Sequence, residues 1–199
     1  MRNLKRDVAA LAFGLALASG AALPAAAQGA GPGMAPGMGQ GSGESLDELF
    51  EELARPGADH DRVADRIGDL WSRSGSASAD LLLRRGRDAL EAGDVEAAID
   101  HLSALVDHAP DFAEAYSARA TAFYAQGRAG EALADLVRAL ELEPRHFGAL
   151  AGLGFVLEDL GHEEDALKAY KAAAALHPGI DMVNEAVERL EFTLGGRTL

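Results

Sequence analysis

The sequence predicts an all-α protein in which similar helix pairs stack side by side. Three observations indicate this fold: a repeat of 34 residues, an abundance of alanine, and a scarcity of aromatic residues, which make up 6% of the chain. Alanine is the best helix former and lets helices approach closely. Hydrophobic residues make up 48% of the 199 residues, enough for a packed core. Repeats of this length are typical of solenoids, in which each unit buries its apolar face against its neighbours.

Five columns of residues recur at intervals of 34. They are Pro110, Pro144 and Pro178; Gly93, Gly127 and Gly161; Ala98, Ala132 and Ala166; Gly86, Ala120 and Gly154; and Ile99, Leu133 and Leu167. We interpret each unit as two antiparallel helices, A and B. The first glycine column closes helix A in a left-handed conformation, and each proline stops helix B. The other small residues let the two helices approach closely. Asp111 and Glu114 are expected to cap the A helix that follows them.

These offsets resemble the tetratricopeptide repeat (TPR) family, whose 34-residue unit has small residues, an intervening glycine and a closing proline at the same places. Residues 113–146, AEAYSARATAFYAQGRAGEALADLVRALELEPRH, match best, and residues 79–112 and 147–180 follow the pattern less closely. The resemblance implies a TPR-type right-handed α-solenoid of antiparallel helix pairs. It also implies a concave groove, lined mostly by the A helices, that binds a protein or peptide.

Two further helical segments flank the three repeats. Residues 45–78 are expected to form a diverged N-terminal helix pair, either a first repeat or an N-terminal cap. Ser45 and Glu48 open its first helix, and Trp71 on its second helix is expected to be a core residue. Residues 181–199 are expected to form a C-terminal capping helix and tail, since end repeats need a polar outer face. Its apolar stripe contains Met182, Val183, Ala186, Val187 and Leu190.

The N-terminal 44 residues have the composition of a targeting sequence followed by a linker. Residues 1–27 combine a basic start, an apolar run and an Ala-x-Ala site before Gln28, the layout of a cleaved signal peptide. An uncleaved membrane anchor is the alternative, although the apolar run is shorter than the ~20 residues that span a bilayer. Residues 28–44 are expected to be a disordered Gly/Pro/Met linker. We therefore expect a periplasmic or secreted protein without stable membrane insertion after cleavage.

Composition argues against several classes of function. The formal charge is −14, without the basic patch that nucleic acid binding requires. The chain has no cysteine, and its six histidines form no metal-binding motif. No nucleophile elbow or nucleotide-binding fingerprint is present. We expect no metal, no cofactor and no small-molecule substrate, and no enzymatic activity; an enzyme with its site in the cap region is the remaining alternative.

The register of the repeats predicts which residues line the groove. They are Leu83, Arg84, Arg87, Ser117, Thr121, Tyr124, Phe155 and Glu158. Tyr124 and Phe155 either anchor a peptide or pack between adjacent repeats. Some TPR proteins hold a C-terminal carboxylate with a fixed Lys/Asn/Arg set, but Thr121 and Phe155 occupy slots of that set here. The expected function is a non-catalytic protein–protein interaction scaffold or adaptor. A periplasmic chaperone or assembly factor, for the envelope or for cytochrome maturation, that presents unfolded clients is the alternative.

Overall fold

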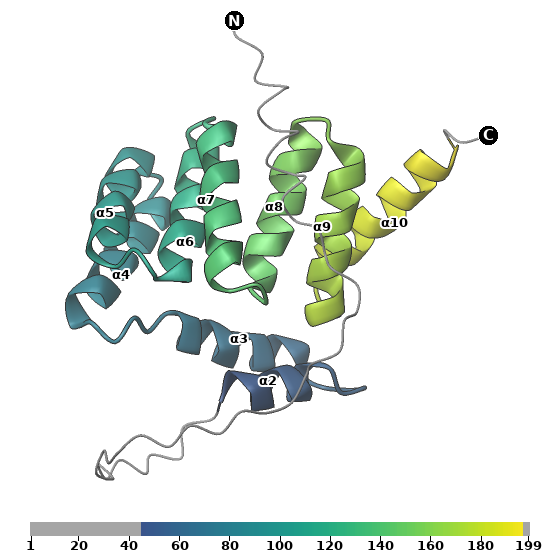
Figure 1. The fold of residues 1–199 in the computed structure, drawn as a ribbon, viewed down its shortest axis with the longest axis horizontal. Coiled ribbons are helices and arrows are strands. Elements are labelled where there is room, and N and C mark those ends of the chain that lie inside the picture. Colours follow the sequence, from purple (N-terminus) through teal and green to yellow (C-terminus); the bar gives the residue numbers. More distant parts are fainter. Residues whose placement is uncertain (1–44, 197–199) are drawn as a thin grey trace, which may run out of the picture. The chain divides into compact units, whose positions relative to one another are not determined.

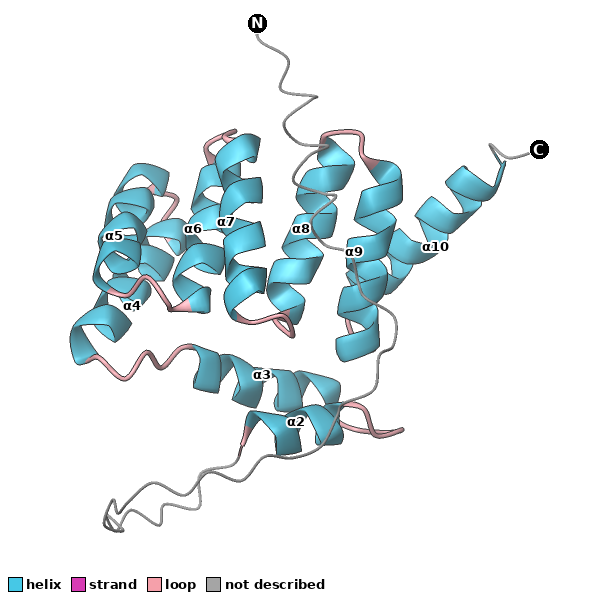
Figure 2. Ribbon diagram, viewed as in Figure 1, coloured by secondary structure: helices cyan, strands magenta, loops and turns pink. Residues whose placement is uncertain are grey.

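The computed structural model describes residues 45–196, which are helical apart from their connecting loops and contain no strand. The signal peptide and the linker expected before residue 45 lie outside this range, as do the last three residues. The helices are α2 (Leu46–Leu53), α3 (His60–Trp71), α4 (Ala77–Glu91), α5 (Val95–His108), α6 (Ala113–Ala125), α7 (Ala129–Leu142), α8 (Phe147–Asp159), α9 (Glu163–Leu176) and α10 (Asp181–Gly196). Figure 2 shows the same helices with their short connecting loops.

Three helix pairs, α4–α5, α6–α7 and α8–α9, stack in series (Figure 1). Each first helix packs along its own second helix, and each second helix packs against the first helix of the next pair. The helix α10 then packs against α9. This arrangement confirms the predicted α-solenoid, with helices A and B of the three repeats as α4 to α9.

The repeated glycines have the two roles that the sequence predicts. Gly93, Gly127 and Gly161 end the A helices with φ of 77°, 79° and 80°, the left-handed region in which a Cβ is unfavourable. Gly154 instead lies inside α8, where a Cβ would come within 2.6 Å of the ring of Tyr170 on α9. The spacing of the repeats therefore reflects both helix termination and close packing of each A helix on its B helix.

The start of α6 differs from the prediction. Its N-cap is Phe112, without a side-chain hydrogen bond, and the side chain of Asp111 is 92% exposed, so Asp111 does not cap the helix. Glu114 is 9% exposed and points to neighbouring helices rather than back to the helix start. The predicted capping box at Ser45 and Glu48 does form, at the beginning of α2. The expected cap at α6 was wrong because Glu114 has stronger partners elsewhere.

The helices α2 and α3 form an N-terminal hairpin that does not stack in front of α4 as a further repeat would. Its own core consists of Leu49, Leu53, Val63 and Ile67. The helix α3 runs across the ends of the repeats instead (Figure 1). The ring of Trp71 near its C-terminus contacts Phe147 at the start of α8, and the ring of His60 at its N-terminus contacts His177 after α9. The hairpin is thus a brace across the solenoid.

The helix α10 covers the last repeat with three of its five predicted stripe residues. Val183, Ala186 and Leu190 are buried against the solenoid, and Val187 is half-buried. Met182 is 69% exposed, so its assignment to the buried stripe was wrong. Within residues 45–196, no helix is long and apolar enough to cross a membrane.

Candidate functional site

A solvent-accessible cavity of about 400 Å³ lies between α6, α8 and the start of α10. Its lining residues are Ala120, Thr121, Tyr124, Leu136, Ala151, Gly152, Phe155, Val156, Tyr170, Ile180, Met182 and Val183. The cavity opens to solvent, because Phe155 and Met182 remain 48% and 69% exposed. Its volume falls within the ~300–1,000 Å³ of typical ligand pockets, and a largely apolar lining with a few polar groups is also typical of them.

Tyr124 and Phe155 form one wall of the cavity. Their rings meet edge to face with centroids 5.2 Å apart and an interplanar angle of 75°. Partial burial and the nearby Asp159 carboxylate raise the pKa of the Tyr124 phenol, so it stays neutral. Packing between repeats and an exposed surface that a peptide could contact are therefore compatible for these residues. The rings pack against each other between two repeats, and Phe155 still presents half of its surface to solvent.

Glu158 occupies a predicted groove position, but its carboxylate is already bound. It forms an ion pair with Arg189 of α10 and accepts a hydrogen bond of 3.2 Å from the Tyr170 hydroxyl. The hydrogen bond from Arg189 lowers the pKa of Glu158, and burial together with Glu158 raises the pKa of Tyr170. Glu158 thus fixes α10 beside the cavity and holds the ring of Tyr170 in its wall, rather than facing a ligand.

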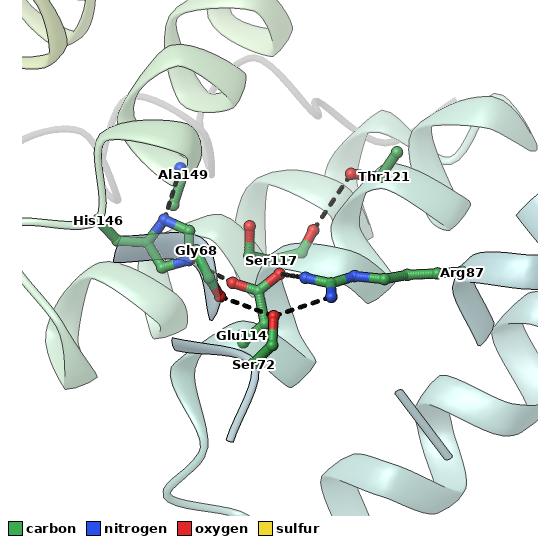
Figure 3. Close-up of polar contacts among 8 residues, drawn as sticks. All are labelled: Gly68, Ser72, Arg87, Glu114, Ser117, Thr121, His146 and Ala149. Carbon is green, nitrogen blue, oxygen red and sulfur yellow. Dashed lines mark hydrogen bonds and ion pairs between the residues drawn. The ribbon is translucent and has the colours of Figure 1, made fainter. Parts of the chain in front are cut away.

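The other half of the A-helix surface carries a polar network formed by Ser72, Arg87, Glu114 and His146 (Figure 3). Arg87 Nη1 donates to Ser72 Oγ at 2.9 Å and Nη2 donates to Glu114 Oε1 at 2.5 Å. The second oxygen of Glu114 lies 2.8 Å from His146 Nε2. These contacts join the C-cap of α3 to α4, α6 and the loop before α8.

The hydrogen bonds assign the tautomer of His146. The backbone N–H of Ala149 donates to His146 Nδ1 at 3.1 Å, which makes Nδ1 an acceptor and caps the start of α8. The proton of a neutral ring is then on Nε2, which donates to Glu114. Glu114 therefore accepts from a guanidinium on one side and an imidazole on the other.

Trp71 covers this network from the side of α3. Its ring stacks on His146 with centroids 4.2 Å apart and an interplanar angle of 16°, and it also contacts Phe147 and Phe50. Its indole Nε1 is buried without a hydrogen-bond partner among the described residues. Trp71 is thus partly buried and packs against the core of the N-terminal hairpin, at the contact between the hairpin and the repeats.

The structure separates the eight predicted groove residues into distinct groups. Thr121, Tyr124 and Phe155 line the cavity, and the carbonyl of Ser117, one turn before Thr121, accepts a 3.2 Å hydrogen bond from the Thr121 hydroxyl. Arg84 is exposed on α4, outside the cavity lining.

Leu83, Arg87 and Glu158 do not face an open groove. Leu83 was wrongly assigned to it: the residue is 2% exposed and packs in the core with residues of α5 and α6. Arg87 and Glu158 bind the chain's own side chains instead of facing a ligand.

Several cavity residues were missed by the sequence analysis. Ala151 stands one repeat after Ser117, so the register could have found it. Ile180, Met182 and Val183 come from the last loop and α10, whose direction the repeat pattern does not define. Across residues 45–196, no group of three or more His, Cys, Asp or Glu side chains is arranged to hold a metal ion.

The stacked helix pairs define an α-solenoid, an architecture whose repeats form an extended concave surface. A model of the tetratricopeptide repeat family matches residues 83–137 and again residues 117–179. The chain therefore contains tetratricopeptide repeats, as its 34-residue period indicates.

Three similar proteins illustrate the range of proteins that carry such repeats. A TPR repeat-containing protein of Rhizobium etli is 34% identical over 134 residues, which are 67% of this chain and 66% of that protein. The first TPR domain of Spaghetti (RPAP3), solved with the HSP90 peptide SRMEEVD, has a TM-score of 0.58 and 22% identity, covering 60% of this chain and 95% of that domain. An O-GlcNAc transferase of Thermobaculum terrenum has a TM-score of 0.55 and 26% identity, covering 60% of this chain but 23% of the transferase. The matches thus support the repeats and their fold.

Proposed function

We propose that this protein is a non-catalytic scaffold or adaptor that binds a segment of a partner protein in the cavity between α6, α8 and α10. The observation that carries the proposal is an open, mostly apolar cavity of about 400 Å³ with the half-exposed Phe155 in its wall. Exposed aromatic side chains at the centre of a concave surface are typical anchors of protein interfaces. The similar TPR domain solved with an HSP90 peptide gives a precedent for peptide binding on this fold.

The chemistry of the lining supports a binding role without catalysis. The lining includes no carboxylate, imidazole, ammonium or guanidinium group, and its side-chain polar atoms are the hydroxyls of Thr121, Tyr124 and Tyr170. Thr121 donates to the Ser117 carbonyl and Tyr170 donates to Glu158. General acid–base chemistry is most effective with a group whose pKa lies near the working pH, and burial raises the pKa of each of the two phenols further above that range. The match to the transferase covers 23% of that enzyme, so it is no evidence for transferase activity in this chain.

A chaperone or assembly factor is the second candidate, favoured by the large apolar side chains on the surface. Leu81, Phe155, Met182 and Phe192 are 39%, 48%, 69% and 86% exposed. Of these, Phe155 and Met182 lie together at the cavity, and an adaptable apolar surface that includes Met can bind many clients weakly. Micromolar binding of many unrelated unfolded peptides supports the chaperone, and a single stoichiometric partner supports the scaffold.

Export to the periplasm is part of the proposal. It rests on the basic, apolar and Ala-x-Ala segments of residues 1–27, which have the layout of a signal peptide. The intact mass of the protein recovered from the envelope fraction tests it. A chain that begins at Gln28 is the expected result, and a chain that retains Met1 contradicts signal cleavage.

A photo-crosslinking experiment tests the binding site. The crosslinking amino acid p-benzoylphenylalanine replaces Thr121 in the cavity or, as a control, the exposed Ala134 of α7, which does not line it. Full-length variants are irradiated in cells and in envelope extract. We expect one partner to crosslink to the cavity position only, and Phe155→Ser to abolish that adduct while the helical circular dichroism signal stays unchanged. Equal adducts at both positions, or none at the cavity, contradict the proposed site.

A further inference from the structure

Three acidic side chains flank the cavity. Asp159, Asp181 and Glu185 are exposed and have no cationic partner among the described residues; we call them the acidic rim. Asp159 follows the lining residue Phe155 by four residues on α8, so the two lie on the same face of that helix, and its carboxylate also contributes to raising the pKa of the Tyr124 phenol. Asp181 directly precedes Met182, another lining residue. Glu185 follows Met182 by three residues on α10 and so lies on the same surface of that helix.

Within the part of the chain that the structure describes, the cation beside this rim is already ion-paired. Arg189 is the guanidinium that contacts this end of the surface, and its charge is already neutralised by Glu158. Arg87 is likewise neutralised by Glu114, in the other half of the A-helix face. The local charge has the same sign as the formal charge of −14 of the whole chain. A negatively charged segment that enters the cavity would therefore be repelled, and a cationic one attracted.

We propose that the cavity takes a large apolar side chain of the partner while lysine or arginine residues beside that anchor bind the acidic rim. This inference rests on the proposed binding function and names the chemistry of its partner. The apolar lining accounts for the anchor, and Asp159, Asp181 and Glu185, which have no cationic partner among the described residues, account for the flanking cations. The preference is opposite to that expected for an acidic segment such as the EEVD end of the HSP90 peptide bound by the similar TPR domain.

Three synthetic peptides of equal length test the preference with the full-length protein. The first, acetyl-KRLFRK-amide, joins an apolar pair to flanking cations; the second, acetyl-EELFEE-amide, reverses the charge; the third, acetyl-KRSSRK-amide, removes the apolar pair. Dissociation constants are measured by fluorescence anisotropy with labelled peptides at 50 and 500 mM NaCl. We expect the first peptide to bind at least about tenfold more tightly than either of the others at 50 mM, a difference that salt reduces by screening.

Matched variants assign the preference to the rim rather than to the acidic chain as a whole. Asp159→Asn with Glu185→Gln removes two charges beside the cavity, and Glu96→Gln with Asp100→Asn removes two exposed charges from α5, which has no residue in the cavity lining. We expect the first pair to weaken binding of the apolar cationic peptide about three- to tenfold and the second pair to leave it within about twofold. Phe155→Ser is expected to weaken the same peptide at least about fivefold.

The outcomes separate this inference from the function on which it rests. Equal binding of the anionic peptide, or equal effects of the two charge-neutralised variants, overturns the proposed partner chemistry. Crosslinking from the cavity would still support peptide binding there. If no peptide binds and the Thr121 position also captures no partner, the proposed function itself fails.

Discussion

The two halves of the A-helix surface show how the same repeat positions serve opposite purposes. Arg87, Thr121 and Phe155 are each 34 residues apart, yet Arg87 is tied to α3 through Ser72 whereas Thr121 and Phe155 line an open cavity. In the N-terminal half, the chain's own hairpin covers polar groups that pair with one another. In the C-terminal half, α10 stands beside the surface and leaves apolar groups accessible. A repeat position alone therefore does not define a binding residue; what the flanking helices cover decides it.

The largest expected effect comes from breaking the network of the covered half. Glu114→Ala removes the acceptor that Arg87 and His146 share, and the nearly buried imidazole loses its partner. We expect the free energy of unfolding to fall by about 2–3 kcal/mol, less than for a fully buried pair because Arg87 can regain water.

Urea denaturation followed by the fluorescence of Trp71, the only tryptophan, measures this loss. Glu131→Ala is the matched control, because that exposed carboxylate pairs only with Arg128 in the described structure, and its loss should cost under about 1 kcal/mol. Equal losses in the two variants would mean that the hairpin does not depend on the network.

In the open half, Gly154→Ala should also destabilise the protein. The new Cβ would lie 2.6 Å from the Tyr170 ring, which forms part of the cavity wall. We expect a loss of about 1–3 kcal/mol from overpacking, together with weaker binding in the cavity. Thermal unfolding and peptide anisotropy measure the two effects. Tyr170→Leu in the same chain should restore part of the stability, and no restoration would place the strain elsewhere.

The hairpin should also make stability depend on pH through His177. Burial, and then the nearby His60, lower the pKa of His177 below its usual 6.5, with Asp61 acting in the opposite direction. The folded state therefore binds fewer protons, so the contribution of neutral His177 is present above pH 6.5 and is lost as the pH falls through the lower folded pKa. His177→Gln should flatten the pH dependence of unfolding between pH 7.5 and 5.5. An unchanged slope in the variant would contradict this assignment.

The smallest expected effect is a gain in stability of the hairpin. A Cβ at Gly68, inside α3, would meet no atom within 4 Å. Gly68→Ala should therefore raise the unfolding free energy by about 0.5–1 kcal/mol through the entropy of the unfolded chain. Urea titration compares it with the wild type. A loss of stability would show that α3 tolerates no added side-chain volume, contrary to the packing described.

The sequence was informative where the determinants are local or periodic. The spacing of Gly93 and Gly127 predicts the helix ends, and Gly154 predicts close contact with the second helix, because each depends on a few neighbouring positions. The α-solenoid and the aromatic pair of Tyr124 and Phe155 follow from the same register.

What the sequence did not predict depends on contacts between distant segments. The sequence pattern predicts Glu114 as part of a helix cap, but its partners Arg87 and His146 are 27 and 32 residues away in the sequence. The helix α10 brings Met182 to the cavity, but it follows the last repeat, so the 34-residue register does not predict its direction. Leu83 was misassigned because residues of α5 and α6 bury it, and the repeat register does not predict those contacts.

Thiol labelling compares the two halves most directly, since the chain has no cysteine and each variant then carries one thiol. Thr121→Cys places it in the cavity and Ser72→Cys places it at the covered network. The rate of maleimide labelling is measured on the full-length protein with and without saturating acetyl-KRLFRK-amide. The account predicts strong protection at position 121 and unchanged labelling at position 72. Protection at position 72 with none at position 121 would contradict it.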